Sequence, residues 1–167
     1  MVGTPSNMPA TSTKYLAIYL NDHLAGSTGG LELVKRAAGE HEGTALGSFL
    51  TELRDDIAED RQVLDDLMDQ LGVGHDKAKV AVAWAAEKAG RLKLNGEIRG
   101  RSPLTPLIEL ETLSMGIEGK RLLWLALGEV EDLPLPKERL AELVVRAEHQ
   151  REGVEYHRRA AARQALN

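Results

Sequence analysis

Five ionisable side chains fall at positions that helices would turn toward the interior of the protein. They are Asp22, His23, Asp60, Glu111 and Glu118. Some helical bundles hold a pair of iron or manganese ions. They bind these ions with carboxylates from several helices and with histidines. The alternative is a network of salt bridges, because an unpaired buried carboxylate costs several kcal/mol.

The spacing of the histidines decides between these two interpretations. Bundles that bind two metal ions use Glu-x-x-His on each of two helices. The residues three positions before the histidines of this chain are Leu20, Ala38, Gly72, Arg146 and Val154. Because none of them is Glu, we favour a network in which His23, Arg121 and Arg151 pair with the interior acids. Two alternatives remain: a metal site with an atypical ligand set, and acids that lie at helix edges and are solvated.

Helices must position these residues, since apolar side chains recur at three- or four-residue spacing and no segment alternates with period two. The sequence predicts helices over residues 13–38, 44–71, 76–94, 103–128 and 136–164. Asp60 takes the place of an apolar residue between Ile57 and Leu64. Glu111 and Glu118 are seven residues apart and therefore share one helix face.

Composition supports one all-α domain. The chain has 167 residues, of which 43% are hydrophobic, 28% charged and only 4% aromatic. This length suits a single core, and the low aromatic content favours helices over strands. We expect residues 1–12 to form a flexible leader and residues 13–167 to form the domain. Short loops between long helices predict an up-and-down four-helix bundle with an additional helix.

Charge and hydropathy narrow the choice of partners. No apolar run is long enough for a membrane span, and the N-terminus lacks the features of a signal peptide, so we expect a cytoplasmic protein with no membrane partner. Cysteine is absent, which excludes disulfides and thiolate chemistry.

Residues 75–101 hold seven basic and three acidic side chains. No aromatic platform or glycine-rich phosphate loop accompanies them, so we expect no nucleic-acid partner.

Oligomerisation is the remaining expectation about partners. Leu94, Ile98 and Leu104 flank a predicted connector and could form an exposed apolar patch. Homodimers are the commonest soluble oligomers. We therefore expect a homodimer.

Four segments carry a family resemblance. They read YLNDHLAGSTGGLEL, EDRQVLDDLMDQLGV, GRLKLNGEIRGRSPL and LIELETLSMGIEGK. Together they resemble an uncharacterised bacterial family that is assigned to the ferritin-like bundles, over about residues 14–160. The resemblance implies a four-helix core with an extra helix and brings no established activity.

The function that we expect is a non-catalytic cytoplasmic bundle, an interaction or stress-associated module with an interior polar network. It would have no catalytic residues and no resident cofactor. The alternative is a di-metal carboxylate protein that binds iron or manganese, or an oxidoreductase built on such a site. In that case Asp22, His23, Asp60, Glu111 and Glu118 would supply the ligands.

Overall fold

The computed structural model describes residues 10–75 and 102–167, which form four helices and no strand. The helices are α1 (Ala10–Glu40), α2 (Ala45–Gln70), α4 (Leu104–Gly128) and α5 (Lys137–Leu166). They confirm the prediction of an all-α bundle and four of the expected helices, with small differences at the ends. The expected helix over residues 76–94 lies outside the described residues. So do residues 1–9 of the leader expected over residues 1–12, whereas residues 10–12 belong to α1.

Local signals explain where the first two helices meet. The side chain of Thr44 caps α2 by accepting a hydrogen bond from the backbone N–H of Gly47, at 3.0 Å. Gly43, in the loop before it, adopts a φ of 78°, which glycine reaches without strain. This short loop makes α1 and α2 antiparallel neighbours.

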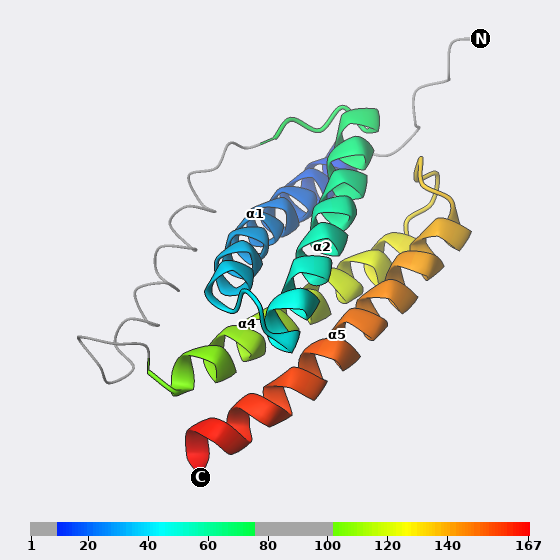
Figure 1. Ribbon diagram of the computed structural model, residues 1–167. Coiled ribbons are helices and arrows are strands. Elements are labelled where there is room, and N and C mark those ends of the chain that lie inside the picture. The colour runs from blue at the N-terminus through cyan, green and yellow to red at the C-terminus, as the bar shows by residue number, and fades with distance from the viewer. Residues whose placement is uncertain (1–9, 76–101) are drawn as a thin grey trace.

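The four helices form two antiparallel hairpins that pack against each other (Figure 1). Helix α1 pairs with α2, and α4 pairs with α5; the hairpins then meet through α1 against α4 and α2 against α5. Consequently α2 and α4 occupy opposite corners of the bundle. The two run in the same direction, so α2 ends at one end of the bundle and α4 begins at the other (Figure 1).

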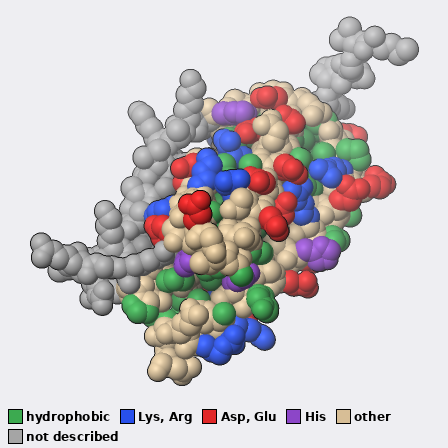
Figure 2. All heavy atoms as spheres, viewed as in Figure 1, with side chains coloured by type: hydrophobic (Ala, Val, Ile, Leu, Met, Phe, Trp, Pro, Cys, Tyr) green, Lys and Arg blue, Asp and Glu red, His purple; other side chains and the backbone are tan. Residues whose placement is uncertain are grey.

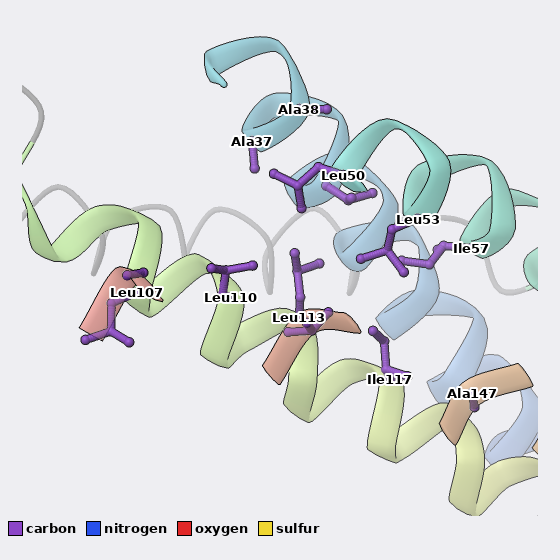
Figure 3. Packing of buried hydrophobic residues seen from close by; sticks show 13 residues of the cluster. Ala37, Ala38, Leu50, Leu53, Ile57, Leu107, Leu110, Leu113, Ile117 and Ala147 are labelled. Atoms are coloured by element: carbon purple, nitrogen blue, oxygen red, sulfur yellow. The ribbon is translucent and has the colours of Figure 1, made fainter. Parts of the chain in front are cut away.

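The core consists of two apolar clusters, one toward each end. The first joins the C-terminal half of α1 to the N-terminal halves of α2 and α4, where Leu50 and Leu53 face Leu110 and Leu113 (Figure 3). Helix α5 contributes residues from Ala147 onward. The second cluster lies at the other end of the bundle. It includes Leu20, Leu24, Leu64, Leu67, Met68, Leu123, Trp124, Leu127, Leu140 and Leu143.

The surface is mixed in charge. Figure 2 shows acidic and basic side chains interspersed over the visible face. Among the helices that the structure describes, none is long and apolar enough to cross a membrane.

Candidate functional site

A layer of polar side chains separates the two apolar clusters. We define the charged layer as Asp60 of α2, Lys120 of α4, and Arg146 and Gln150 of α5. Asp60 is only 2% exposed and Gln150 only 5%, so both lie in the interior. The layer exists because polar residues interrupt apolar stripes of α2 and α4. Lys120 falls between buried Ile117 and Leu123, as Asp60 falls between Ile57 and Leu64.

The members of the charged layer bind one another through hydrogen bonds and ion pairs. The Nζ of Lys120 donates hydrogen bonds to Oδ2 of Asp60 and to Oε1 of Gln150, the latter at 2.5 Å. The Nε2 of Gln150 donates to Oδ2 of Asp60 at 3.2 Å. The Nε of Arg146 lies 3.5 Å from Oδ1 of Asp60. Because α2 and α4 are at opposite corners, the Lys120–Asp60 pair ties the bundle together across its diagonal.

The charged layer continues to the surface between α2 and α5. The Nη2 of Arg146 donates to Oδ1 of Asp56 at 2.9 Å and to Oε2 of Glu59 at 2.8 Å. Both acids are well exposed. Arg146 therefore links the buried carboxylate of Asp60 to two solvated carboxylates, which spreads the charge of the layer toward water.

Burial is the strongest influence on the pKa of Lys120. It lowers the pKa of the ammonium group below its usual value, while the neighbouring carboxylate of Asp60 opposes this shift. Without Asp60, only the weaker attraction of Asp56 would oppose the effect of burial on this pKa. The pair is therefore interdependent, and each charge makes the burial of the other tolerable.

A partly open cavity of about 200 Å³ lies on the α1 side of the charged layer and is lined by α1, α2 and α4. Asp60 and Lys120 form part of its wall. Four glycines also line it: Gly26 and Gly30 from α1, and Gly116 and Gly119 from α4. Apolar side chains supply most of the remaining wall.

Three of the residues predicted from the sequence meet at this cavity. Asp22, His23 and Asp60 all line it, although Asp22 is exposed to solvent and His23 is half-buried. The ring of His23 packs edge-on against Tyr19, with centroids 4.6 Å apart. Burial lowers the pKa of His23, and the charge of Asp22 opposes that shift.

The other two predicted residues lie on the outer side of α4, toward α5. Glu118 accepts hydrogen bonds from Arg121 at 2.9 Å and from Arg151 at 2.7 Å, which confirms the expected pairing with these two arginines. These contacts lower the pKa of Glu118, with the Arg121 hydrogen bond as the largest cause. The side chain of Glu111 is 47% exposed and lies 3.5 Å from Arg158.

The five predicted residues thus divide among the cavity and two surface ion-pair groups, and do not form one closed network. Within residues 10–75 and 102–167, no group of three or more His, Asp or Glu side chains is arranged to hold a metal ion. The metal interpretation stays a prediction that finds no assembled ligand set in the described residues.

Sequence reasoning missed the partner of Asp60. Lys120 could have been found, because it falls three residues after Ile117 and three before Leu123 on the buried stripe of α4. Glu109 was also missed: it is 2% exposed and accepts a hydrogen bond from Nη2 of Arg36 in α1, at 3.0 Å. It lies beside buried Leu110, and the spacing pattern alone gave no reason to place a carboxylate inside.

We compared the chain with protein-family models, curated proteins and solved structures, and none of the three comparisons gave a match. None of these comparisons therefore bears on the resemblance to ferritin-like bundles.

Proposed function

We propose that this protein is a non-catalytic helical bundle of ferritin-like type, which acts by binding another molecule. The observation that carries this proposal is the mutual pairing of Lys120 and Asp60 in the charged layer. These are the buried ionic groups best placed for chemistry, and each is engaged by the other. The charged layer is then a structural element that holds three helices in register.

The same pairing disfavours two kinds of catalysis. A lysine nucleophile must present a free amine, whereas Nζ of Lys120 donates to both Asp60 and Gln150. A metal ion bound by Asp60 would lie close to the ammonium of Lys120, and two cations at such a distance repel each other strongly in a buried site. The donor set therefore does not fit a metal pair.

The ferritin-like part of the proposal is supported by topology. Helices α2 and α4 run in the same direction at opposite corners of the bundle, so α2 ends and α4 begins at opposite ends (Figure 1). Ferritin-like folds are four-helix bundles in which one long crossover joins two parallel helices. The additional helix and a cytoplasmic location remain part of the proposal.

A homodimer is also proposed. Of the three residues in the expected apolar patch, Leu104 packs against the first apolar cluster of its own chain. Leu94 and Ile98 lie outside the described residues. Light scattering on dilute protein tests the dimer, and a monomer mass would contradict it.

The alternative function, a di-metal carboxylate protein, is favoured by one observation. Asp22, His23 and Asp60 line the same cavity. A rearrangement that freed Asp60 from Lys120 would bring a carboxylate toward the other two residues.

Metal analysis separates the two functions. Protein purified without chelator should contain far less than one iron or manganese ion per chain, and an Asp60→Asn variant should contain no less. A near-stoichiometric metal content that falls in the Asp60→Asn variant would overturn the proposed function.

A further inference from the structure

We propose that the cavity between α1, α2 and α4 binds a small uncharged molecule with an apolar body and a carbonyl oxygen. This inference rests on the proposed function in one respect. Lys120 and Asp60 stay paired in the wall of the cavity, so the ligand is held and is not transformed.

The glycines of the cavity are the first argument. Glycine inside a helix costs roughly 0.5–1 kcal/mol relative to alanine, so an interior glycine usually allows close contact between helices. Among the residues that the structure describes, an added Cβ at Gly26, Gly30, Gly116 or Gly119 would meet no neighbouring atom within 4 Å. Close packing thus does not account for these four glycines. What they have in common is that they keep one space open.

An unused hydrogen-bond donor is the second, independent argument. Trp124 lines the cavity and is only 1% exposed. Its indole N–H has no hydrogen-bond acceptor among the described residues. A buried donor without a partner costs about 1–3 kcal/mol, and a ligand oxygen would remove that cost.

The charges around the cavity indicate an uncharged ligand. Lys120 is compensated by Asp60, and Arg61 lies 3.6 Å from Asp65. The exposed Asp22 at the cavity would repel an anion. An anion would also enter a mainly apolar space whose two cations, Lys120 and Arg61, already have carboxylate partners, whereas a cation would lie beside those same two cations; both are unfavourable.

The size of the cavity sets the size of the ligand. An apolar cavity of about 150 Å³ takes up benzene, so about 200 Å³ suits a slightly larger molecule. Ile57, Leu64, Leu113 and Ile117 are among the apolar residues that would contact its body.

Acetophenone is a suitable probe, since it is uncharged and mainly apolar and carries one carbonyl group. Isopropylbenzene has nearly the same shape without the acceptor, and benzoate has a similar size with a negative charge. We expect acetophenone to bind at least tenfold more tightly than either compound, as measured by calorimetry. The indole N–H resonance of Trp124, assigned with a Trp124→Phe variant, should move on binding. Absence of acetophenone binding at millimolar concentration would overturn the inference.

Two variants test the location. Gly26→Ala/Gly30→Ala/Gly116→Ala/Gly119→Ala should be at least as stable as the wild type but should bind acetophenone at least tenfold more weakly. Gly39→Ala is the matched control: it lies on α1 outside the cavity, is equally free of clashes and should leave binding unchanged. Unchanged binding in the quadruple variant would overturn the proposed site. Trp124→Phe should bring the affinities for acetophenone and isopropylbenzene to within about twofold.

The fate of the probe distinguishes this inference from the proposed function. Acetophenone recovered unchanged after incubation agrees with both. Acetophenone that binds and is chemically converted would support the cavity and contradict the non-catalytic function. Failure of acetophenone to bind would remove the cavity proposal, while the low metal content that tests the proposed function would be unaffected.

Discussion

At the scale of single residues, two carboxylates that look alike in the sequence lie in opposite surroundings. In the sequence, both Asp60 and Glu111 occupy positions on a helix face that the spacing of apolar residues predicts to be buried. Asp60 is 2% exposed and held by Lys120, whereas the side chain of Glu111 is 47% exposed and has only a distant contact with Arg158. Their replacement should therefore have very different consequences.

Replacing Glu111 by leucine should change the free energy of unfolding by about 0.5 kcal/mol or less, because exposed ion pairs contribute little. Asp60→Leu should cost roughly 3–5 kcal/mol, since it leaves the buried ammonium of Lys120 without its main partner. Urea unfolding of the two variants checks this difference. A strong destabilisation by Glu111→Leu would show that its carboxylate belongs to the interior.

His23 should make stability depend on pH. Burial holds the pKa of the folded imidazole below the value of 6.5 that it has in the unfolded chain. The unfolded state therefore takes up a proton first as the pH falls, so the contribution of neutral His23 is complete above pH 6.5 and is lost below it. The free energy of unfolding should fall between pH 7 and pH 5 in the wild type, and less steeply in His23→Gln. Equal slopes for the two proteins would contradict the buried state of His23.

At the scale of elements, the helices could be predicted because the signals that define them are local. The stripe of α2, the Thr44 cap and the break at Gly72 all lie within a few residues of the features they produce. The partners of the charged residues are not local. Periodicity places Asp60 on the inner face of α2, but only the corner-to-corner arrangement of α2 and α4 shows that Lys120 meets it.

The start of α2 offers a test of close packing. A Cβ added to Gly47 would lie 2.0 Å from the backbone oxygen of His41, which cannot move without distorting the loop between α1 and α2. Gly47→Ala should therefore destabilise the protein by about 1–3 kcal/mol.

Gly39→Ala is the control for Gly47→Ala, because it adds the same methyl group near the end of α1, where no neighbour from the described part of the chain lies within 4 Å. It should be neutral or stabilising by up to about 1 kcal/mol. Thermal melts compare the two variants. Equal effects would mean that the close contact at Gly47 does not exist in solution.

At the scale of the whole molecule, the charged layer lies between the two apolar clusters and joins three of the four described helices. An ionic layer costs desolvation, and apolar residues of similar size could fill the same space with equal or greater stability. The layer instead fixes the register of the helices, which is the alignment of α2, α4 and α5 along the bundle. Only one alignment of α2, α4 and α5 brings Asp60, Lys120 and Gln150 together.

The most direct test of this account is a double-mutant cycle on the Lys120–Asp60 pair, with Lys120→Met, Asp60→Leu and the double variant compared by urea unfolding. Each single change should cost roughly 3–5 kcal/mol. The double variant should be more stable than the sum of the single effects predicts by about 2 kcal/mol or more, because neither charge is left alone. Additive single effects would contradict the claim that Lys120 and Asp60 stabilise each other inside the bundle.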